Sequence, residues 1–267
     1  MFHELLAETW LTKPKADVRN LASKDGSILV VPVGATEQHG CHLPTGTDTI
    51  LATAAAQAGA DRVEDDVPVL LTPPLWIGYS PHHLPFGGTI SAEHNTFVDT
   101  VVETVDSAAQ NGFDAIMLLN GHGGNKSLLS TATSVAGRKN PDVEVSTLFY
   151  LDLLGPHVDD IKRSDVPGTH GGELETALML SVCPQLVDED EMSSTPQEEP
   201  YANTATGLLD AGSVSVYRTF DEYTESGTLG DPSAATAEAG DRALELVGDE
   251  IATILRSIHE YVRAQDP

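Results

Sequence analysis

The sequence predicts an α/β fold with a mainly parallel central sheet. Four short apolar runs, at residues 27–34, 67–73, 113–120 and 143–150, are continuous rather than alternating, as expected for strands covered on both faces. The segments between these runs have helical patterns. Alternation of strands and helices favours right-handed crossovers and therefore a parallel sheet.

The helices follow from apolar spacing and from capping signals. An Ala-rich segment predicts a helix over residues 48–60, and apolar residues at helical spacing predict another over 95–111. A third helix is expected over 125–138, with Asn125 as its N-cap. Residues 233–265 have the spacing of one long amphipathic helix that packs on the sheet.

Two segments, 73–94 and 184–232, show no regular pattern. Both are longer than typical connections, which indicates functional loops or interface arms. The sequence contains no convincing linker. We therefore expect residues 1–267 to form a single domain.

The composition is strongly acidic, with 14 Lys and Arg against 41 Asp and Glu, a formal net charge of −27 and a pI near 4.4. Such a surface repels nucleic acids and anionic membranes, so neither is expected as a partner. Because about 1 M salt shortens the Debye length to about 3 Å, dense like charge is tolerated there. The acidic residues are spread along the whole chain, and we expect a halophilic protein.

The chain is expected to be cytoplasmic. Its N-terminus, MFHELLAETW, lacks the apolar core of a signal peptide, and no apolar run approaches the roughly 20 residues needed to span a membrane. Two cysteines, Cys41 and Cys183, are too few for a disulfide framework.

Polar clusters follow the predicted strands. Glu37 and His39 come shortly after the first strand, and Asp48 stands at the start of the next helix, where it could also serve as a cap. His122, within NGHGGN, directly follows the strand at 113–120. Because ligands bind outside the carboxyl ends of parallel strands, we expect these side chains to converge on one rim of the sheet.

A further cluster, HGGELET at residues 170–176, opens an apolar helix and places His170 three residues before Glu173. Residues at this spacing share a helix face once the turn has begun. With His170 left aside, the clusters offer the imidazoles of His39 and His122 and the carboxylates of Glu37, Asp48 and Glu173, a mixed set that suits Zn²⁺ or Mn²⁺. Asp48 is central in this set and is the candidate to bridge two ions about 3.5–4 Å apart.

Three segments in this order, PVGATEQHGCHLPTGTDT, NGHGGN and HGGELET, resemble the creatininase family of metal-dependent amidohydrolases. SPHHLPFGGTIS (80–91) and GTLGDPSAATAEAG (227–240) are similar to further family segments, and the resemblance covers roughly residues 28–262. It implies a three-layer α/β/α fold, a binuclear metal site and a homohexamer built as a trimer of dimers. By motif position, the residues that match family metal ligands are Glu37, His39, Asp48 and His122, with Asp48 bridging.

The chain departs from creatininase at two places. Creatininase has a glutamate ligand two positions after the motif histidine, where this chain has Gly124. We expect Glu173 to supply the fifth ligand instead, with Glu175 as a hydrogen-bonding support. Creatininase also closes tryptophans over its substrate, whereas the only tryptophans here are Trp10 and Trp76. Creatinine is therefore one candidate substrate among several amides.

The resemblance and the site chemistry together predict a hydrolase. His170 is the expected proton donor to the leaving nitrogen, with a purely structural histidine as the alternative. Ser80, His82 and Gly123 are the expected substrate contacts. The predicted cofactors are two divalent ions per chain, Zn²⁺ or Mn²⁺ or both, with iron as an option.

The predicted function is hydrolysis of a C–N bond in a small cyclic or linear amide, with conversion of creatinine to creatine included. Two other activities use the same chemistry: a formylaminopyrimidine deformylase of flavin or deazaflavin biosynthesis, and a redox-cofactor precursor peptidase of the mycofactocin type. From another class, a non-catalytic metal- or ligand-binding α/β scaffold would hold at most one ion. The number of bound ions separates this scaffold from the enzymes.

Overall fold

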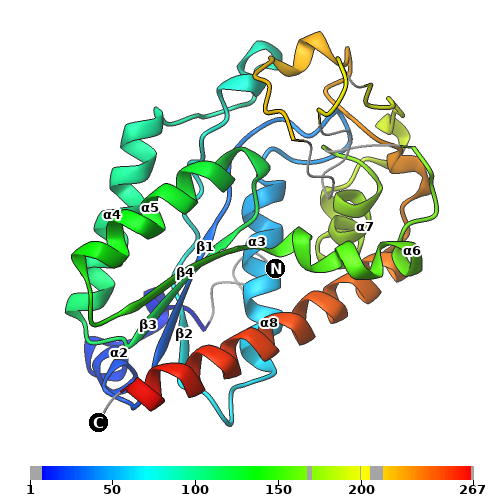
Figure 1. Ribbon diagram of the computed structural model, residues 1–267. Helices are drawn as coiled ribbons and strands as arrows, with labels where there is room; N and C mark the ends of the chain where they lie inside the picture. The colour runs from blue at the N-terminus through cyan, green and yellow to red at the C-terminus, as the bar shows by residue number, and fades with distance from the viewer. Residues whose placement is uncertain (1–7, 167–169, 199, 205–212, 266–267) are drawn as a thin grey trace.

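The computed structural model describes residues 8–166, 170–198, 200–204 and 213–265, so the start of the N-terminal segment MFHELLAETW lies outside the described residues. A parallel four-stranded sheet with the order β2-β1-β3-β4 forms its centre (Figure 1). The strands are β1 (Ile28–Val33), β2 (Val69–Leu71), β3 (Ala115–Asn120) and β4 (Glu144–Phe149). Each lies within one of the four predicted runs, which confirms the parallel α/β fold.

Helices connect the strands and extend beyond them. The α-helices are α2 (Lys15–Ala22), α3 (Thr47–Asp61), α4 (His94–Gln110), α5 (Lys126–Lys139), α6 (Val158–Ile161), α7 (Glu173–Val182) and α8 (Ala237–Gln265). The 3₁₀ turns are η1 (Trp10–Thr12), η2 (Pro81–Phe86), η3 (Gly123–Asn125), η4 (Tyr150–His157), η5 (Pro184–Leu186), η6 (Glu189–Glu191), η7 (Phe220–Glu222) and η8 (Pro232–Ala234). The patterns at 48–60, 95–111, 125–138 and 170–176 predict α3, α4, α5 and α7.

The sheet separates two hydrophobic cores. Alternate residues of β1 point to opposite faces, so that Ile28 and Val30 join the core under α3, α7 and α8, while Leu29 and Val31 join the core under α2, α4 and α5. Figure 1 shows α3 and α8 on one side of the sheet and α4 and α5 on the other. This arrangement confirms the three-layer α/β/α fold.

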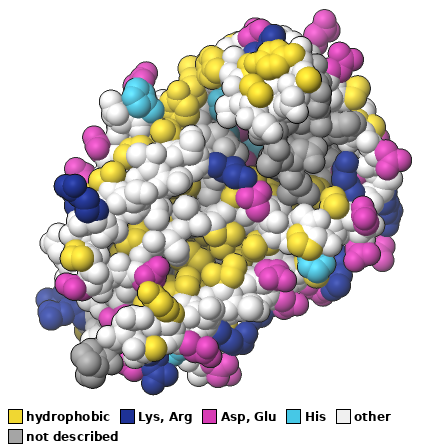
Figure 2. All heavy atoms as spheres, viewed as in Figure 1, with side chains coloured by type: hydrophobic (Ala, Val, Ile, Leu, Met, Phe, Trp, Pro, Cys, Tyr) yellow, Lys and Arg dark blue, Asp and Glu magenta, His cyan; other side chains and the backbone are white. Residues whose placement is uncertain are grey.

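Figure 2 shows acidic side chains scattered over the visible face rather than gathered in one patch.

The long C-terminal helix begins later than its apolar spacing predicts. Pro232 belongs to η8, and α8 starts at Ala237, where the Thr236 hydroxyl accepts the backbone N–H of Ala239 at 3.2 Å. A hydroxyl in this position is a typical N-terminal cap.

No helix in the described part of the chain combines the length and apolar character needed to cross a bilayer.

Asn125 stands at the N-cap position of α5, as predicted, but its side chain makes no capping hydrogen bond to the helix. The Asn125 amide instead connects two loops. Its Nδ2 donates to the Gly34 carbonyl at 3.0 Å, and its Oδ1 accepts the Tyr79 backbone N–H at 2.9 Å. These loops carry the polar residues that follow β1 and the turn η2. Asn125 therefore helps to position the candidate site.

Candidate metal centre

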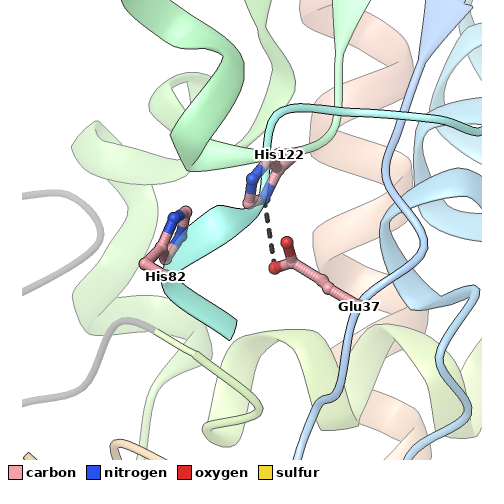
Figure 3. A group of neighbouring side chains, drawn as sticks. All are labelled: Glu37, His82 and His122. Carbon is pink, nitrogen blue, oxygen red and sulfur yellow. Dashed lines mark ion pairs between the residues drawn. The ribbon is translucent and has the colours of Figure 1, made fainter. Parts of the chain in front are cut away.

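A buried cluster of imidazoles and carboxylates lies at the carboxyl edge of the sheet. Glu37 and His39 come from the loop after β1, Asp48 from the first turn of α3, and His122 directly follows β3. All four side chains are buried. Figure 3 shows the Glu37 carboxylate pointing toward His122, from which it is 3.2 Å away. The structure thus brings together four of the five predicted metal ligands.

Asp48 lies between the two imidazoles. Its Oδ1 is 3.1 Å from Nε2 of His39, and its Oδ2 is 3.2 Å from Nδ1 of His122. Asp48 is the second residue of α3, whose N-cap position is Gly46, so Asp48 is not the cap that its sequence position also allowed. A carboxylate with one oxygen toward each imidazole has the placement that the predicted bridging role requires.

Backbone carbonyls orient both imidazoles. The Nδ1–H of His39 donates to the Glu37 carbonyl at 3.1 Å, which leaves Nε2 facing the carboxylates. In His122 the roles are exchanged: Nε2 lies 3.2 Å from the Tyr79 carbonyl, and Nδ1 faces the carboxylates. Histidines that ligate metals typically donate their second N–H to such a partner. Each ring therefore turns one nitrogen toward the carboxylates, on opposite sides of Asp48.

The structure places Glu175, and not Glu173, beside these groups. Oε1 of Glu175 lies 3.7 Å from Nε2 of His39, and its Oε2 accepts the Gly171 N–H at 2.7 Å. Glu173 points elsewhere: its two oxygens accept the backbone N–H groups of Arg163 at 2.6 Å and Ser164 at 2.9 Å. The placement therefore differs from the expectation that Glu173 ligates and Glu175 supports.

Three further histidines surround Glu37. Nε2 of His83 is 3.2 Å and Nδ1 of His170 is 3.7 Å from Glu37 Oε1. The His82 ring stacks on the ring of His122, with centroids 5.7 Å apart and an angle of 8° between the planes (Figure 3). His83 was not among the predicted site residues, because the sequence does not show which of two adjacent histidines in a loop faces inward.

The other predicted substrate contacts lie next to His122. The Ser80 hydroxyl is 3.2 Å from Nε2 of His122, the ring nitrogen that does not face the carboxylates. Gly123, the residue that follows His122, is exposed. At Gly124 a Cβ would lie 2.4 Å from Nε2 of His122 and 2.9 Å from the His82 ring. A side chain at position 124 would therefore collide with His122 and the Tyr79 carbonyl as well as with His82.

The carboxylates attract positive charge to the centre. Burial opposes protonation of His122, but the Glu37 and Asp48 carboxylates outweigh it and raise the pKa of His122 to about 10. Asp48 and Glu175 likewise raise the pKa of His39 against the effect of burial. Burial favours neutral Glu37, yet His122 and His83 hold the pKa of Glu37 well below its usual value.

The donor set fits divalent metal ions. Both carboxylate oxygens of Glu37 and Oδ2 of Asp48 are buried without a hydrogen bond, although imidazole nitrogens lie 3.2 Å from Glu37 Oε1 and from Asp48 Oδ2. Buried oxygens of this kind are costly unless a partner satisfies them. Three groups of three residues each bring their ligand atoms within 4.8 Å of one another. They are Glu37 with His82 and His122, Glu37 with His39 and His170, and His39 with Asp48 and Glu175.

Fold and site together define a class of protein: a three-layer α/β/α protein with an imidazole–carboxylate metal centre at the carboxyl edge of a parallel sheet. The chain belongs to the creatininase family, because the family model described as creatinine amidohydrolase matches residues 12–255. The family assignment confirms the resemblance seen in the three sequence motifs.

Characterised relatives have different substrates. The chain is 33% identical over 234 residues to the mycofactocin precursor peptide peptidase of Mycobacterium ulcerans, which covers 85% of this chain and 84% of that protein. It is 30% identical over 248 residues to the creatinine amidohydrolase of Pseudomonas putida, and the match covers 86% of this chain and 88% of that protein. It is 26% identical over 258 residues to the 3-dehydro-scyllo-inosose hydrolase of Thermotoga maritima, and the match covers 89% of this chain and 79% of that protein.

Solved structures agree with the family assignment. The crystal structure of a creatinine amidohydrolase superposes with a TM-score of 0.81 at 27% identity, covering 94% of this chain and 97% of that chain. A creatininase variant of the Zn–Zn type and a Mn creatininase both give a TM-score of 0.80, at 27% and 25% identity; they cover 93% and 94% of this chain and 97% and 98% of their own. The chain is thus a creatininase-family amidohydrolase, and creatininase structures hold Zn or Mn.

Proposed function

We propose that this chain hydrolyses the C–N bond of a cyclic or linear amide at a centre of two divalent ions. The observation that carries the proposal is the position of Asp48, with one oxygen toward His39 and the other toward His122. Glu37 completes the His122 side, and Glu175 completes the His39 side. We assign the fifth ligand to Glu175, since both oxygens of the predicted ligand Glu173 are engaged by backbone N–H groups.

Ions in this centre would polarise the substrate carbonyl and lower the pKa of water toward neutrality. His170 is the proposed proton carrier. Its Nε2–H donates to the Gln38 carbonyl, so the unprotonated Nδ1 faces Glu37. Burial, assisted by His39 and His83, lowers the pKa of His170, so the ring is neutral at pH 7. A neutral ring could take up at Nδ1 the proton that the attacking water loses, and then give this proton to the leaving nitrogen.

The substrate is proposed to be a small amide, with creatinine as one candidate. The tryptophans do not lie where a lid over the histidines would place them: Trp10 packs on Phe113, and Trp76 lines a surface pocket with Ile77 and Ile90. A precursor peptide is the second candidate, favoured by the 33% identity to the M. ulcerans peptidase. Deformylation of a formylaminopyrimidine and assembly as a homohexamer stay predictions.

The experiment uses protein purified in molar KCl and loaded with Mn²⁺ or Zn²⁺. Creatinine, formamides and a short peptide are incubated with it, with and without a chelator, and C–N cleavage is followed by mass spectrometry. We expect chelator-sensitive turnover that Glu37→Ala abolishes and that Glu93→Ala, in which an exposed carboxylate is removed, leaves intact.

Two results would overturn the proposal. One is a Glu37→Ala protein that keeps both ions and full activity. The other is a wild-type protein that holds at most one ion after loading and cleaves none of these amides, which would favour the non-catalytic scaffold.

A further inference from the structure

An aromatic side chain from a distant part of the chain covers the histidines of the metal centre. The Phe220 ring lies 4.1 Å from the His83 ring, 5.0 Å from His170 and 5.5 Å from His82, measured between centroids. His83 and His170 are buried, whereas Phe220 is partly exposed. The Phe220 ring therefore forms part of the boundary between the site and the solvent.

The backbone around Phe220 is held from both directions. On the N-terminal side, Thr219 and Glu222 form a capping box at the start of η7. This turn lies against η2 (Figure 1). On the C-terminal side, the Gly227 carbonyl accepts a hydrogen bond from Nε2 of Gln38 at 3.1 Å. Gln38 stands between two proposed ligands in the sequence. The segment that carries Phe220 is thus tied directly to the ligand loop.

We propose that Phe220 determines substrate specificity, by packing its ring on a planar apolar group next to the scissile carbonyl. A phenyl ring gains most from a second ring in an offset or edge-to-face arrangement. Phe220 offers such a contact beside the histidines, and its side chain is partly exposed. The inference rests on the proposed function, because it takes the metal centre as the place where the carbonyl binds.

The test needs no knowledge of the substrate. Acetohydroxamate and benzohydroxamate bind metal ions through the same group and differ only in a methyl or a phenyl substituent. Each is titrated into protein loaded with Co²⁺, and binding is read from the visible absorption of the ion. We expect the wild type to bind benzohydroxamate about 3- to 10-fold more tightly, the range of one aromatic pair.

Three variants isolate the ring of Phe220. Phe220→Ala should lose most of this preference while its affinity for acetohydroxamate stays the same. Phe220→Leu keeps apolar volume without the ring and should retain an intermediate preference. Tyr217→Ala is the matched control, since this aromatic side chain is 66% exposed, and it should behave as the wild type. The Co²⁺ content of each protein is measured first.

The outcomes separate this inference from the proposed function. A benzohydroxamate preference that survives in Phe220→Ala, or one absent from the wild type, overturns the role of Phe220. Equal loss of both hydroxamates in Phe220→Ala and Phe220→Leu also overturns it, because the ring would then only support the site. If neither compound perturbs bound Co²⁺ in the wild type, the centre lacks open coordination, and the proposed function fails together with the inference.

Discussion

Glu175→Gln removes one buried carboxylate charge from the centre and keeps the shape of the side chain. Oε1 of Glu175 lies 3.7 Å from Nε2 of His39, on the side where we place the second ion. At about 4 Å and an effective dielectric constant of about 20, the carboxylate attracts each unit of charge on the ion by about 4 kcal/mol. Because each 1.4 kcal/mol is tenfold in affinity and the ion is divalent, we expect the ion on the His39 side to bind at least about a thousandfold more weakly.

Glu173→Gln is the matched control, with the same loss of charge two positions away. Glu173 accepts the N–H groups of Arg163 and Ser164, so its loss weakens hydrogen bonds to a charged group. Each such bond contributes about 1.5–3 kcal/mol, and we expect a lower free energy of unfolding with unchanged metal affinity. Metal content after dialysis against a metal buffer and urea unfolding of the metal-free proteins measure the two effects. A Glu173→Gln protein that loses the second ion while Glu175→Gln keeps it would refute this reasoning.

Three further predictions concern turnover, pH and salt. His170→Gln should keep both ions and lower kcat by about 10²- to 10⁴-fold on any amide that the wild type cleaves, whereas unchanged turnover would remove His170 from the reaction. Metal affinity should increase with pH up to about 10, because His39 and His122 have raised pKa values and must lose their protons to bind an ion. Calorimetry in buffers of different ionisation enthalpy should detect this proton release, and binding without release at pH 7 would contradict it. With a net charge of −27, the protein should unfold at lower temperature in dilute buffer than in molar KCl, and sucrose should not replace the salt.

The sheet was predictable because its strands are covered on both faces. All six residues of β1 and of β3 are buried, and such strands appear in a sequence as continuous apolar runs. The edge at which the ligands meet follows from the same pattern, since parallel strands end on one side. Glu37, His39, Asp48 and His122 therefore converge where their positions after the strands predict.

The choice between Glu173 and Glu175 depends on where a helix begins. Residues two apart in a helix point to nearly opposite faces, so only one of the two carboxylates can face the site. In the structure Gly171 has φ +58°, and the turn there directs its N–H to Glu175. A Cβ at Gly171 would also lie 3.0 Å from the His39 carbonyl. The sequence shows the glycine but not the start of the helix.

His83 and Phe220 illustrate what a local pattern does not contain. Both lie in the segments 73–94 and 184–232, which show no regular spacing. Their rings meet only because η2 and η7 pack together at the edge of the sheet. A contact of this kind is tertiary, so no motif in either segment predicts it.

The most direct test of the account counts metal ions in the wild type, in Asp48→Ala and in the surface control Glu93→Ala. Each protein is loaded with Zn²⁺ or Mn²⁺, dialysed against a metal buffer and analysed by mass spectrometry. The bridging position of Asp48 predicts close to two ions per chain in the wild type and in the control, and at most one in Asp48→Ala. A single ion in the wild type, or two ions retained without Asp48, would contradict the binuclear centre.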